Sequence, residues 1–359
     1  MSSDGMTRRN IESHRIVGIV CLIGLASAPF LLGILTLRQL TAALFLGMFA
    51  MSWDYVSGYT GQLSFGHSMF FGIGGYTAAV LNLNVGLSPV VTILAGTVAA
   101  GIAGLLVGVP ALRLRGPYLA LITLIAPLVL VQIVNIYPDM LGGEGGLQGM
   151  DLLVAVDEPI GVLSAVGFES AFEHRVVVYY YVALLLFLAI YALFYVFTRS
   201  YVGSVFTAIR EDEDAVAAVG VDAAKFKLFA FTMSGVVGGL AAATLVHTPL
   251  AGAAPERLLV LPVSIEVVLI GFLGGMGTIT GPAATGIVFY FVRDTLQASD
   301  AVIPLVGLPV GEVWEVLFYS IALLVLFALP RGVLPWLSDL SRTVRDRNDP
   351  SAEPISETH

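Results

Sequence analysis

The sequence predicts an all-α protein, a polytopic membrane helical bundle with about ten transmembrane helices. Of its 359 residues, 57% are hydrophobic and only 12% are charged, and the mean hydropathy is +0.90. A soluble domain carries about 25% charged residues. A membrane-spanning helix needs roughly 20 apolar residues, and runs of that kind recur along most of the chain. One membrane domain is therefore expected rather than several soluble domains.

The predicted spans follow one another from residue 16 to residue 329. The first run is too long, and continues too directly into the second, for a cleaved signal peptide. The ninth is short for a full crossing, so it is a candidate to pair with the eighth as broken or tilted helices, and nine spans remain an alternative. The ten spans are 16–35, 39–57, 66–83, 89–110, 118–136, 178–197, 228–247, 259–276, 281–293 and 312–329.

The distribution of basic residues predicts the orientation, because cytoplasmic loops carry an excess of Lys and Arg. With a cytoplasmic N-terminus, 13 of the 17 basic residues fall in inner segments. Both termini are therefore placed in the cytoplasm: a segment 1–15 and a polar tail 331–359, expected to be disordered, flank a transmembrane domain 16–330. The four basic residues left in outer segments are Arg38, Arg175, Arg257 and Arg293.

The longest predicted outer loop, 137–177, is strongly acidic. It is interpreted either as a solvated loop or as a docking surface for an external partner. Its seven carboxylates are Asp139, Glu144, Asp151, Asp157, Glu158, Glu169 and Glu173. Within the spans, glycines stand four apart, a spacing that lets helix backbones approach closely. The pairs are Gly104 and Gly108, Gly235 and Gly239, Gly271 and Gly275, and Gly277 and Gly281.

The inner loop 198–227 is predicted to contain a short helix. Acidic residues 211–214 suit a helix N-terminus, Gly220 is placed to end the helix in a left-handed cap, and Asp222 can cap the next helix. An ordinary charged loop is the alternative. The apolar stripe of the helix would consist of Val205, Ile209, Val216 and Val219.

The stretch from Arg210 to Gly220 and on through Lys227 to Ala241 resembles the ATPase-coupling loop and the following helix of branched-chain amino acid ABC transporter permeases, the LivM branch in particular. In that family this loop docks on the ATP-hydrolysing subunit, so the resemblance implies a coupling role for loop 198–227. The implied coupling residues are Gly203, Arg210, Glu211, Asp212, Glu213, Ala217, Gly220 and Lys227.

The segment 58–76 is similar to the family's glycine-rich GxxGQxSxGHxxFxGxGxY motif. Glycines and polar side chains at an apolar boundary are unusual for a lipid-facing helix, because irregular backbone at membrane depth is tolerated only where it is buried or lines a cavity. A packed helix junction and direct lining of the pathway are both open. The pathway candidates here are Gly58, Gly61, Gln62, Ser64, Gly66, His67 and Tyr76.

Three further elements extend the resemblance over about 45–330. Residues 112–123 resemble R-x-x-G-x-Y-L-A-x-x-T, residues 142–149 lie where the family often has T-G-G-x-x-G-I, although the Thr is absent, and residues 264–282 match S-x-E and G-G-x-G-x-x-x-G-P. Glu266 is a further pathway candidate. A carboxylate in a span costs on the order of 2.5–3.5 kcal/mol. Glu266 therefore either makes a hydrogen bond that packs two helices together or has a role in the pathway or gate. The same two interpretations apply to Asp54.

No sequence motif predicts catalysis. There is no phosphate-binding G-x-x-x-x-G-K-[ST] and no H-E-x-x-H, and the five histidines have no metal-ligand spacing. Catalytic residues, metal sites and cofactors of its own are therefore not expected, and ATP would be used by a partner subunit. The chain is predicted to be a transport subunit and not an enzyme.

The resemblance implies a permease subunit of an ATP-driven importer in the cytoplasmic membrane, carrying branched-chain or related amino acids. The implied partners are a second related permease, two ABC ATPase subunits, an extracytoplasmic substrate-binding protein and membrane lipids, with no nucleic acid. Urea or short amides are alternative substrates within the same family. An ion-coupled secondary transporter is the alternative from another class, although few acidic residues lie within the spans to bind a coupling ion.

Overall fold

The computed structural model describes residues 18–111, 117–156, 158, 160–165, 167–303, 307–329, 332, 333 and 336. Within these residues every regular element is a helix, accompanied by two isolated β-bridges, Leu147 with Ala253 and Val302 with Pro309. The predicted segment 1–15, nearly all of the tail 331–359, Asp157 and the pair Arg113 and Arg115 lie outside the described residues.

Helices account for most of the described chain. A first helix, Gly18–Leu31, precedes α2. The others are α2 (Ile34–Thr60), α3 (Ser68–Val85), α4 (Pro89–Ala111), α5 (Pro117–Ile136), α6 (Pro138–Leu141), η1 (Gly143–Gly145), α7 (Gly161–Ala165), α8 (Ala171–Thr198), α9 (Tyr201–Glu211), α10 (Glu213–Ala218), α11 (Ala223–Leu245), α12 (Pro255–Leu258), α13 (Leu261–Gly274), α14 (Thr280–Gln297), η2 (Val310–Glu312) and α15 (Trp314–Ala328).

Six of the described helices are long and apolar enough to cross a membrane. They are Ile34–Thr60, Pro89–Val109, Tyr118–Ile136, Ala171–Thr198, Ala223–Leu245 and Pro255–Gly274. Two shorter apolar helices, Gly18–Leu31 and Trp314–Ala328, accompany them. The chain is thus a multi-pass, all-helical membrane protein, and the total of about ten spans stays a prediction.

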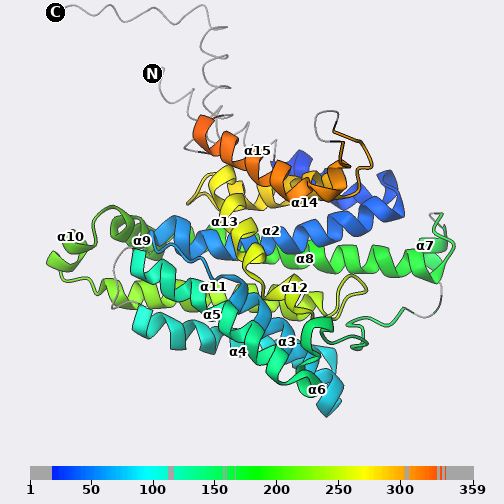
Figure 1. Ribbon diagram of the computed structural model, residues 1–359, viewed down its shortest axis with the longest axis horizontal. Coiled ribbons are helices and arrows are strands. Elements are labelled where there is room, and N and C mark those ends of the chain that lie inside the picture. Colours follow the sequence, from blue (N-terminus) through cyan, green and yellow to red (C-terminus); the bar gives the residue numbers. More distant parts are fainter. Residues whose placement is uncertain are drawn as a thin grey trace, which may run out of the picture.

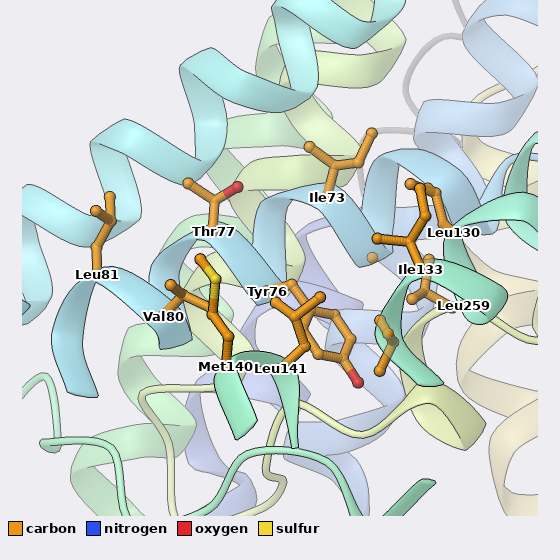
Figure 2. Close-up of a pocket in the computed structure, with 12 residues that line it drawn as sticks. Ile73, Tyr76, Thr77, Val80, Leu81, Leu130, Ile133, Met140, Leu141 and Leu259 are labelled. Carbon is orange, nitrogen blue, oxygen red and sulfur yellow. The ribbon is translucent and has the colours of Figure 1, made fainter. Parts of the chain in front are cut away.

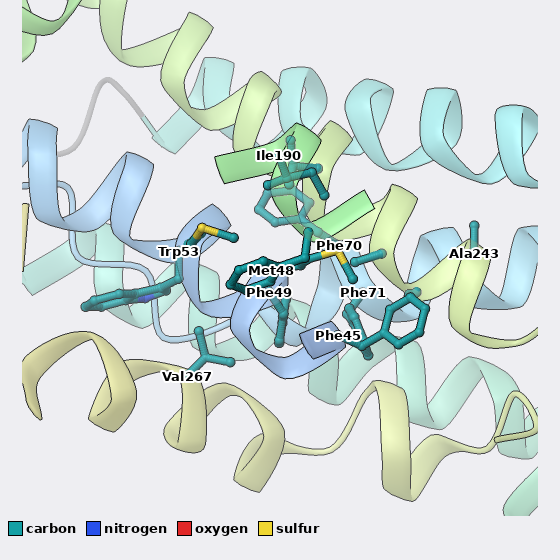
Figure 3. Close-up of a cluster of buried hydrophobic side chains, with 14 of the residues drawn as sticks. Phe45, Met48, Phe49, Trp53, Phe70, Phe71, Ile190, Ala243 and Val267 are labelled. Carbon is teal, nitrogen blue, oxygen red and sulfur yellow. The ribbon is translucent and has the colours of Figure 1, made fainter. Parts of the chain in front are cut away.

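Helix α2 lies at the centre of the bundle, where it packs against α8, α11, α13 and α14 (Figure 1). Its buried face supplies three aromatic side chains, Phe45, Phe49 and Trp53, to the hydrophobic cluster that also contains Phe70 and Phe71 of α3 (Figure 3). Trp53 and Phe70 are fully buried. The core of the molecule is therefore built around the first long helix.

Small residues bring α3, α4 and α11 into backbone contact. A Cβ atom on Gly74 would overlap the backbone of Gly239, and one on Gly96 would overlap the carbonyl oxygen of Gly74. The predicted pairs behave in the same way, since Gly235 faces the Ala100 carbonyl and Gly271 faces the Trp53 ring. Close helix approach through small residues, as the spacing predicted, is confirmed at these positions.

Two predicted boundaries are wrong because helices continue through polar residues. Helix α8 begins at Ala171 and not at 178, because Ser170 and Glu173 form a capping box: the Glu173 amide donates to Ser170 Oγ over 3.2 Å and the Ser170 amide to Glu173 Oε2 over 3.0 Å. Helix α14 is 18 residues long and continues past Arg293 to Gln297, whereas the predicted span ended at 293. Arg175 and Arg293 therefore belong to helices.

The loops 137–177 and 198–227 lie at opposite ends of the bundle. Helices α9 and α10 are at the left of Figure 1, and α7 is at the right. Helix α2 runs from the α7 end toward the α9 end, and α11 returns in the other direction (Figure 1). The two loops that the sequence placed on opposite sides of the membrane are therefore separated by the length of the long helices.

Candidate functional site

Loop 198–227 folds into two helices where the sequence predicted one. Helix α9 follows Ser200, whose side chain accepts from the Val202 amide over 3.2 Å. It ends at Asp212, which has an extended backbone and caps α10 by accepting from the Ala215 amide over 2.9 Å. A short carboxylate side chain competes for backbone amides in this way, so the acidic run breaks the helix. Glu211 consequently ends α9 instead of starting a helix.

The two predicted caps of this loop are confirmed. Gly220 has a φ of +83°, and the bonds Gly220 N to Ala217 O (3.0 Å) and Val221 N to Val216 O (3.3 Å) form a Schellman motif. Asp222 caps α11 by accepting from the Lys225 amide over 3.3 Å. Hydrogen bonds from the Lys225 side chain and backbone hold the pKa of Asp222 below its usual value.

The apolar stripe of the loop is only partly as predicted. Val205, Ile209 and Val216 are buried and pack with Ala223 at the start of α11. Val219 is 78% exposed, so its assignment to the stripe is wrong. It follows the last residue of α10, where the chain turns into the left-handed cap and its side chain leaves the packed face. Ala217 is also exposed. The loop thus has one anchored face and one free face.

A buried ion pair holds α10 to α11. Lys227 is 1% exposed, and its Nζ lies 2.6 Å from Glu213 Oε2. Gly203 is a buried residue of α9 itself, where a Cβ atom would overlap the Thr198 backbone. The bond between Lys227 and Glu213 is charge-assisted, and such bonds are roughly twice as strong as neutral ones. The sequence named both Lys227 and Glu213, but not that they pair.

Arg210 connects α9 to the centre of the bundle. Its Nη1 donates to the carbonyl oxygen of Gly58 near the end of α2, over 2.8 Å. On the same turn of α2, Asp54 accepts from the amides of Gly277 (2.7 Å) and Ile279 (3.0 Å), which lie between α13 and α14. A Cβ atom on Gly58 would overlap the Asp54 carboxylate. We call these five residues, Asp54, Gly58, Arg210, Gly277 and Ile279, the junction.

The junction contains backbone strain. Ile279 has a φ of +55°, the only positive value for a residue other than glycine among the described residues. A β-branched residue in this region costs of order 1–3 kcal/mol and persists only where surrounding contacts enforce it. The Asp54 carboxylate supplies that enforcement through the Ile279 amide. The α13–α14 turn is therefore held in a high-energy conformation by α2.

The glycine-rich segment 58–76 is a packed junction of helices along most of its length. His67 is fully buried between Ser52 Oγ (2.8 Å) and Ser234 Oγ (3.3 Å). Trp53 Nε1 donates to the Ser64 carbonyl over 2.7 Å. A Cβ atom on Gly66 would overlap the Thr123 carbonyl.

The chain turns at Gly61, which ends α2 with a φ of +71°, before the half-buried Gln62. Of the described cavities, none is lined by a residue of 58–67. Of the two open interpretations of these residues, the geometry therefore favours packing.

Serine side chains join this segment to α13. The Ser68 amide donates to Ser264 Oγ over 2.9 Å, and Ser68 Oγ donates to the Leu259 carbonyl over 3.0 Å. Ser264 begins the S-x-E element that the sequence comparison with the family singled out, yet its bond to Ser68 was not predicted. The motif 58–76 and the motif 264–282 are thus in direct contact.

Tyr76 lies apart from the other candidates of its segment. It lines an apolar cavity of about 300 Å³ between α3 and α5, with Ile73, Leu130 and Leu259 around it (Figure 2). Its hydroxyl group has no hydrogen-bond partner among the described residues. Apart from this group and Thr77, the side chains that line the cavity are apolar, and none of them is charged.

Glu266 lines a different and larger cavity, of about 810 Å³. Arg293 of α14 donates to both its carboxylate oxygens, over 2.7 and 2.9 Å. Glu266 thus pairs with a neighbouring helix and also faces a cavity, while its role in the pathway or gate stays a prediction. The sequence missed Arg293 and also missed Asp294, which accepts from Gln39 Nε2 over 2.6 Å. Charged residues within apolar helices were the available signal.

Comparisons with known proteins agree with this architecture. A family model described as "Branched-chain amino acid transport system / permease component" matches residues 35–328. The high-affinity branched-chain amino acid permease LivM of Escherichia coli K12 is 29% identical over 332 residues, 88% of this chain and 74% of the relative. LivM of Salmonella typhimurium LT2 is 30% identical over 79% of this chain and 66% of the relative.

An archaeal relative extends the comparison. A probable LivM permease of Methanocaldococcus jannaschii is 26% identical over 74% of this chain and 78% of its own length. No solved structure matches. The family match covers every helix from α2 to α15, including the junction and loop 198–227. The chain therefore belongs to the permease-component family of branched-chain amino acid transport systems, and it is a permease of the LivM type.

Proposed function

We propose that this permease is one subunit of an ATP-driven importer that carries branched-chain or related amino acids across the cytoplasmic membrane. The observation that carries the proposal is the anchoring of loop 198–227. Lys227 fixes α10 to α11, and Arg210 fixes α9 to α2. A load applied to the exposed face of α9 and α10 reaches the centre of the bundle through these two contacts. ATP hydrolysis takes place on a partner subunit.

The free face of the loop is the proposed contact with an ATPase. Val219 is an apolar side chain that is 78% exposed beside the exposed Ala217 and Glu211. An exposed apolar side chain at the tip of a capped helix suits insertion into a groove of a partner. One permease chain offers one such loop, so two ATPases need two permeases. We propose a second, related permease as the other half, and an extracytoplasmic binding protein as the source of substrate.

Reconstitution tests the complete proposal. Liposomes that contain this permease, its related permease, the ATPases and the binding protein should take up leucine on addition of ATP. The same mixture without the related permease should take up none. Uptake in that second preparation would mean that two copies of this chain suffice. Uptake driven by an ion gradient without ATP would contradict an ATP-driven importer, and competition by urea but not by leucine would assign the alternative substrate.

The proposed orientation places both termini and loop 198–227 in the cytoplasm. Cys21 is exposed and is the single cysteine of the chain, so it is first replaced by Ser. A cysteine introduced at Met150, within the acidic loop, should react with an impermeant maleimide in intact cells. One introduced at Pro350 should react only after the cells are opened. The reverse pattern would invert the orientation.

A further inference from the structure

The largest of the described cavities runs along the first half of α2. Leu35 and Phe49 both line it, together with residues of α12, α13, α14 and α15. The 14 steps between these two residues correspond to about 21 Å at 1.5 Å per residue. Gln297, the last residue of α14, lies at the same end as Leu35. The cavity therefore begins at the end of the bundle that carries loop 137–177 and reaches roughly the middle of α2.

Side chains of both charges face this cavity. The positive charge comes from Arg38, Arg257 and Arg293, and the negative charge from Glu256, Glu266, Asp294 and Glu315. Among these seven residues, Glu266 and Arg293 form the one direct ion pair. Charges inside a membrane protein are expensive and mark ligand or ion sites. A wall with both signs suits a ligand that is itself zwitterionic, because such a ligand presents a carboxylate and an ammonium group together.

The rest of the wall is apolar. Phe45 and Phe49 of α2, Phe71 of α3, Leu245 and Val263 contribute to it. The volume of about 810 Å³ lies within the range of ligand pockets, which is about 300–1,000 Å³. Charged groups that fix orientation beside an aromatic and aliphatic surface are the composition of such pockets. The apolar wall therefore has room for an aliphatic side chain next to the charged groups.

Aromatic side chains close the cavity toward loop 198–227. The rings of Phe49 and Phe71 lie 4.3 Å apart, and the Phe49 ring lies 5.1 Å from the imidazole of His67. Beyond them come the fully buried Trp53 and then Asp54 of the junction. His67, from the segment for which packing and pathway lining were both open, thus packs behind the closed end of the cavity.

We propose that this cavity is a binding site for a free amino acid, in which Arg293 and Arg38 receive the carboxylate, Glu266 and Asp294 receive the ammonium group, and the aromatic wall receives the aliphatic side chain. The proposal rests on the proposed function, because an amino acid reaches the site only if the permease transports one. It adds that the permease itself selects its substrate, in addition to any selection by a binding protein.

Uptake kinetics in the reconstituted system test the assignment. Glu266→Gln and Arg293→Met should each raise the KM for leucine at least tenfold, while ATPase co-purification stays unchanged. A purely structural ion pair would lower the amount of folded protein and the maximal rate instead. The side-chain wall is tested separately by Ala42→Leu, since Ala42 lines the cavity on α2. This variant should reduce leucine uptake at least fivefold relative to alanine uptake.

Ala189→Leu is the matched control, because Ala189 is exposed on α8 and lines none of the described cavities. It should leave the leucine-to-alanine ratio unchanged. If Glu266→Gln and Arg293→Met do not fold, the Ala42→Leu ratio decides alone. An unchanged ratio for Ala42→Leu, or unchanged KM values for folded charge variants, would overturn the proposal. These outcomes differ from a failure of the proposed function, in which the unmodified complex itself would take up no amino acid.

Discussion

The two ends of the bundle are held together by different kinds of hydrogen bond. At the end formed by loop 198–227, charged side chains bond to the backbone: Arg210 to the Gly58 carbonyl, and Asp54 to the amides of Gly277 and Ile279. At the other end, the acidic loop is held mainly by backbone groups and neutral side chains, with two charged exceptions: Asn82 Nδ2 donates to Asp151 Oδ2 over 3.0 Å, and Arg175 Nη2 donates to the Val156 carbonyl over 3.2 Å. Thr92 Oγ1 lies 2.7 Å from His247 Nε2, and Tyr179 OH accepts from the Val154 amide over 3.0 Å.

This difference separates a stiff end from an adaptable one. Bonds to ionised groups are roughly twice as strong as neutral ones, so α9, the end of α2 and the α13–α14 turn move as one body. Before α8 begins at Ala171, the acidic loop contains only short helices, and most of its bonds to the bundle are neutral and therefore individually weaker. The stiff end suits transmission of force, and the adaptable end suits contact with changing partners. Each prediction below strengthens or removes this contrast.

The largest effect is expected at Asp54. Asp54→Ala removes the acceptor of two backbone amides, and each lost bond to a charged group is worth about 1.5–3 kcal/mol. The strained Ile279 turn then relaxes, so uptake should fall to background and the melting temperature of the purified permease should drop. Asp54→Asn keeps one acceptor oxygen and should lose less. Asp300→Asn, at an exposed residue, is the control; equal stability of Asp54→Ala and this control would contradict the junction.

Arg210→Met should separate docking from transport. The variant loses the bond to Gly58 but leaves the exposed face of α9 and α10 in place. We expect the ATPase to co-purify normally while ATP-dependent uptake falls at least tenfold. Asp300→Asn changes a charge on an exposed residue outside loop 198–227 and should transport normally. Uptake by Arg210→Met at the parental rate would show that force does not reach α2 through this contact.

Gly220→Val is expected to act on docking alone. A β-branched residue at a φ of +83° costs about 1–2 kcal/mol, which distorts the turn between α10 and α11 without touching the bundle. The ATPase retained on the purified permease should fall severalfold, and membrane insertion should be unchanged. Gly145→Val makes the same change at a glycine without a positive φ and with open space around it. If Gly220→Val retains the ATPase normally, the left-handed cap at Gly220 is not needed for ATPase docking.

The smallest effect is expected at the adaptable end, as a dependence on pH. Burial lowers the pKa of the His247 imidazole, so the neutral form is favoured in the folded protein. The resulting stabilisation is fully present above the unfolded pKa, about 6.5, and is lost as the pH falls from there toward the lower folded pKa.

Proteolysis of loop 137–177 measures this effect. Cleavage should be faster at pH 5 than at pH 8, and His247→Gln should reduce this difference. A cleavage rate that does not change with pH in the unmodified protein would contradict the role of His247. The stiff end serves as an internal control, since loop 198–227 should show no such change.

The sequence predicted features that depend on neighbouring residues and missed those that depend on distant ones. The Gly220 cap and the Asp222 cap follow from residues within a few positions, and both are present. The pairing of Arg210 with Gly58 joins residues 152 positions apart, and no local pattern encodes it. The start of α8 was misplaced for a related reason, since a capping box of polar residues lowers the hydropathy where the helix begins.

The candidate site was affected in the same way. Glu266 was identified because a carboxylate in an apolar run is costly, but Arg293 ended a predicted span and was counted as a loop residue. Only the packing of α13 against α14 brings the two together. Likewise, the sequence singled out the polar residues of 58–67, but whether a buried polar group faces a cavity or another helix is decided by tertiary structure.

The Asp54 bond to Gly277 also has a consequence for biosynthesis. The two residues are 223 positions apart. At about 5–20 residues per second, the ribosome needs roughly 11–45 seconds to deliver the second after the first. During that interval α2 has been made, but the Gly277 and Ile279 amides that donate to the Asp54 carboxylate have not. We therefore expect the nascent helix to stay near water or the insertion machinery until α13 and α14 arrive, so that α2 takes its central place in the bundle late in assembly.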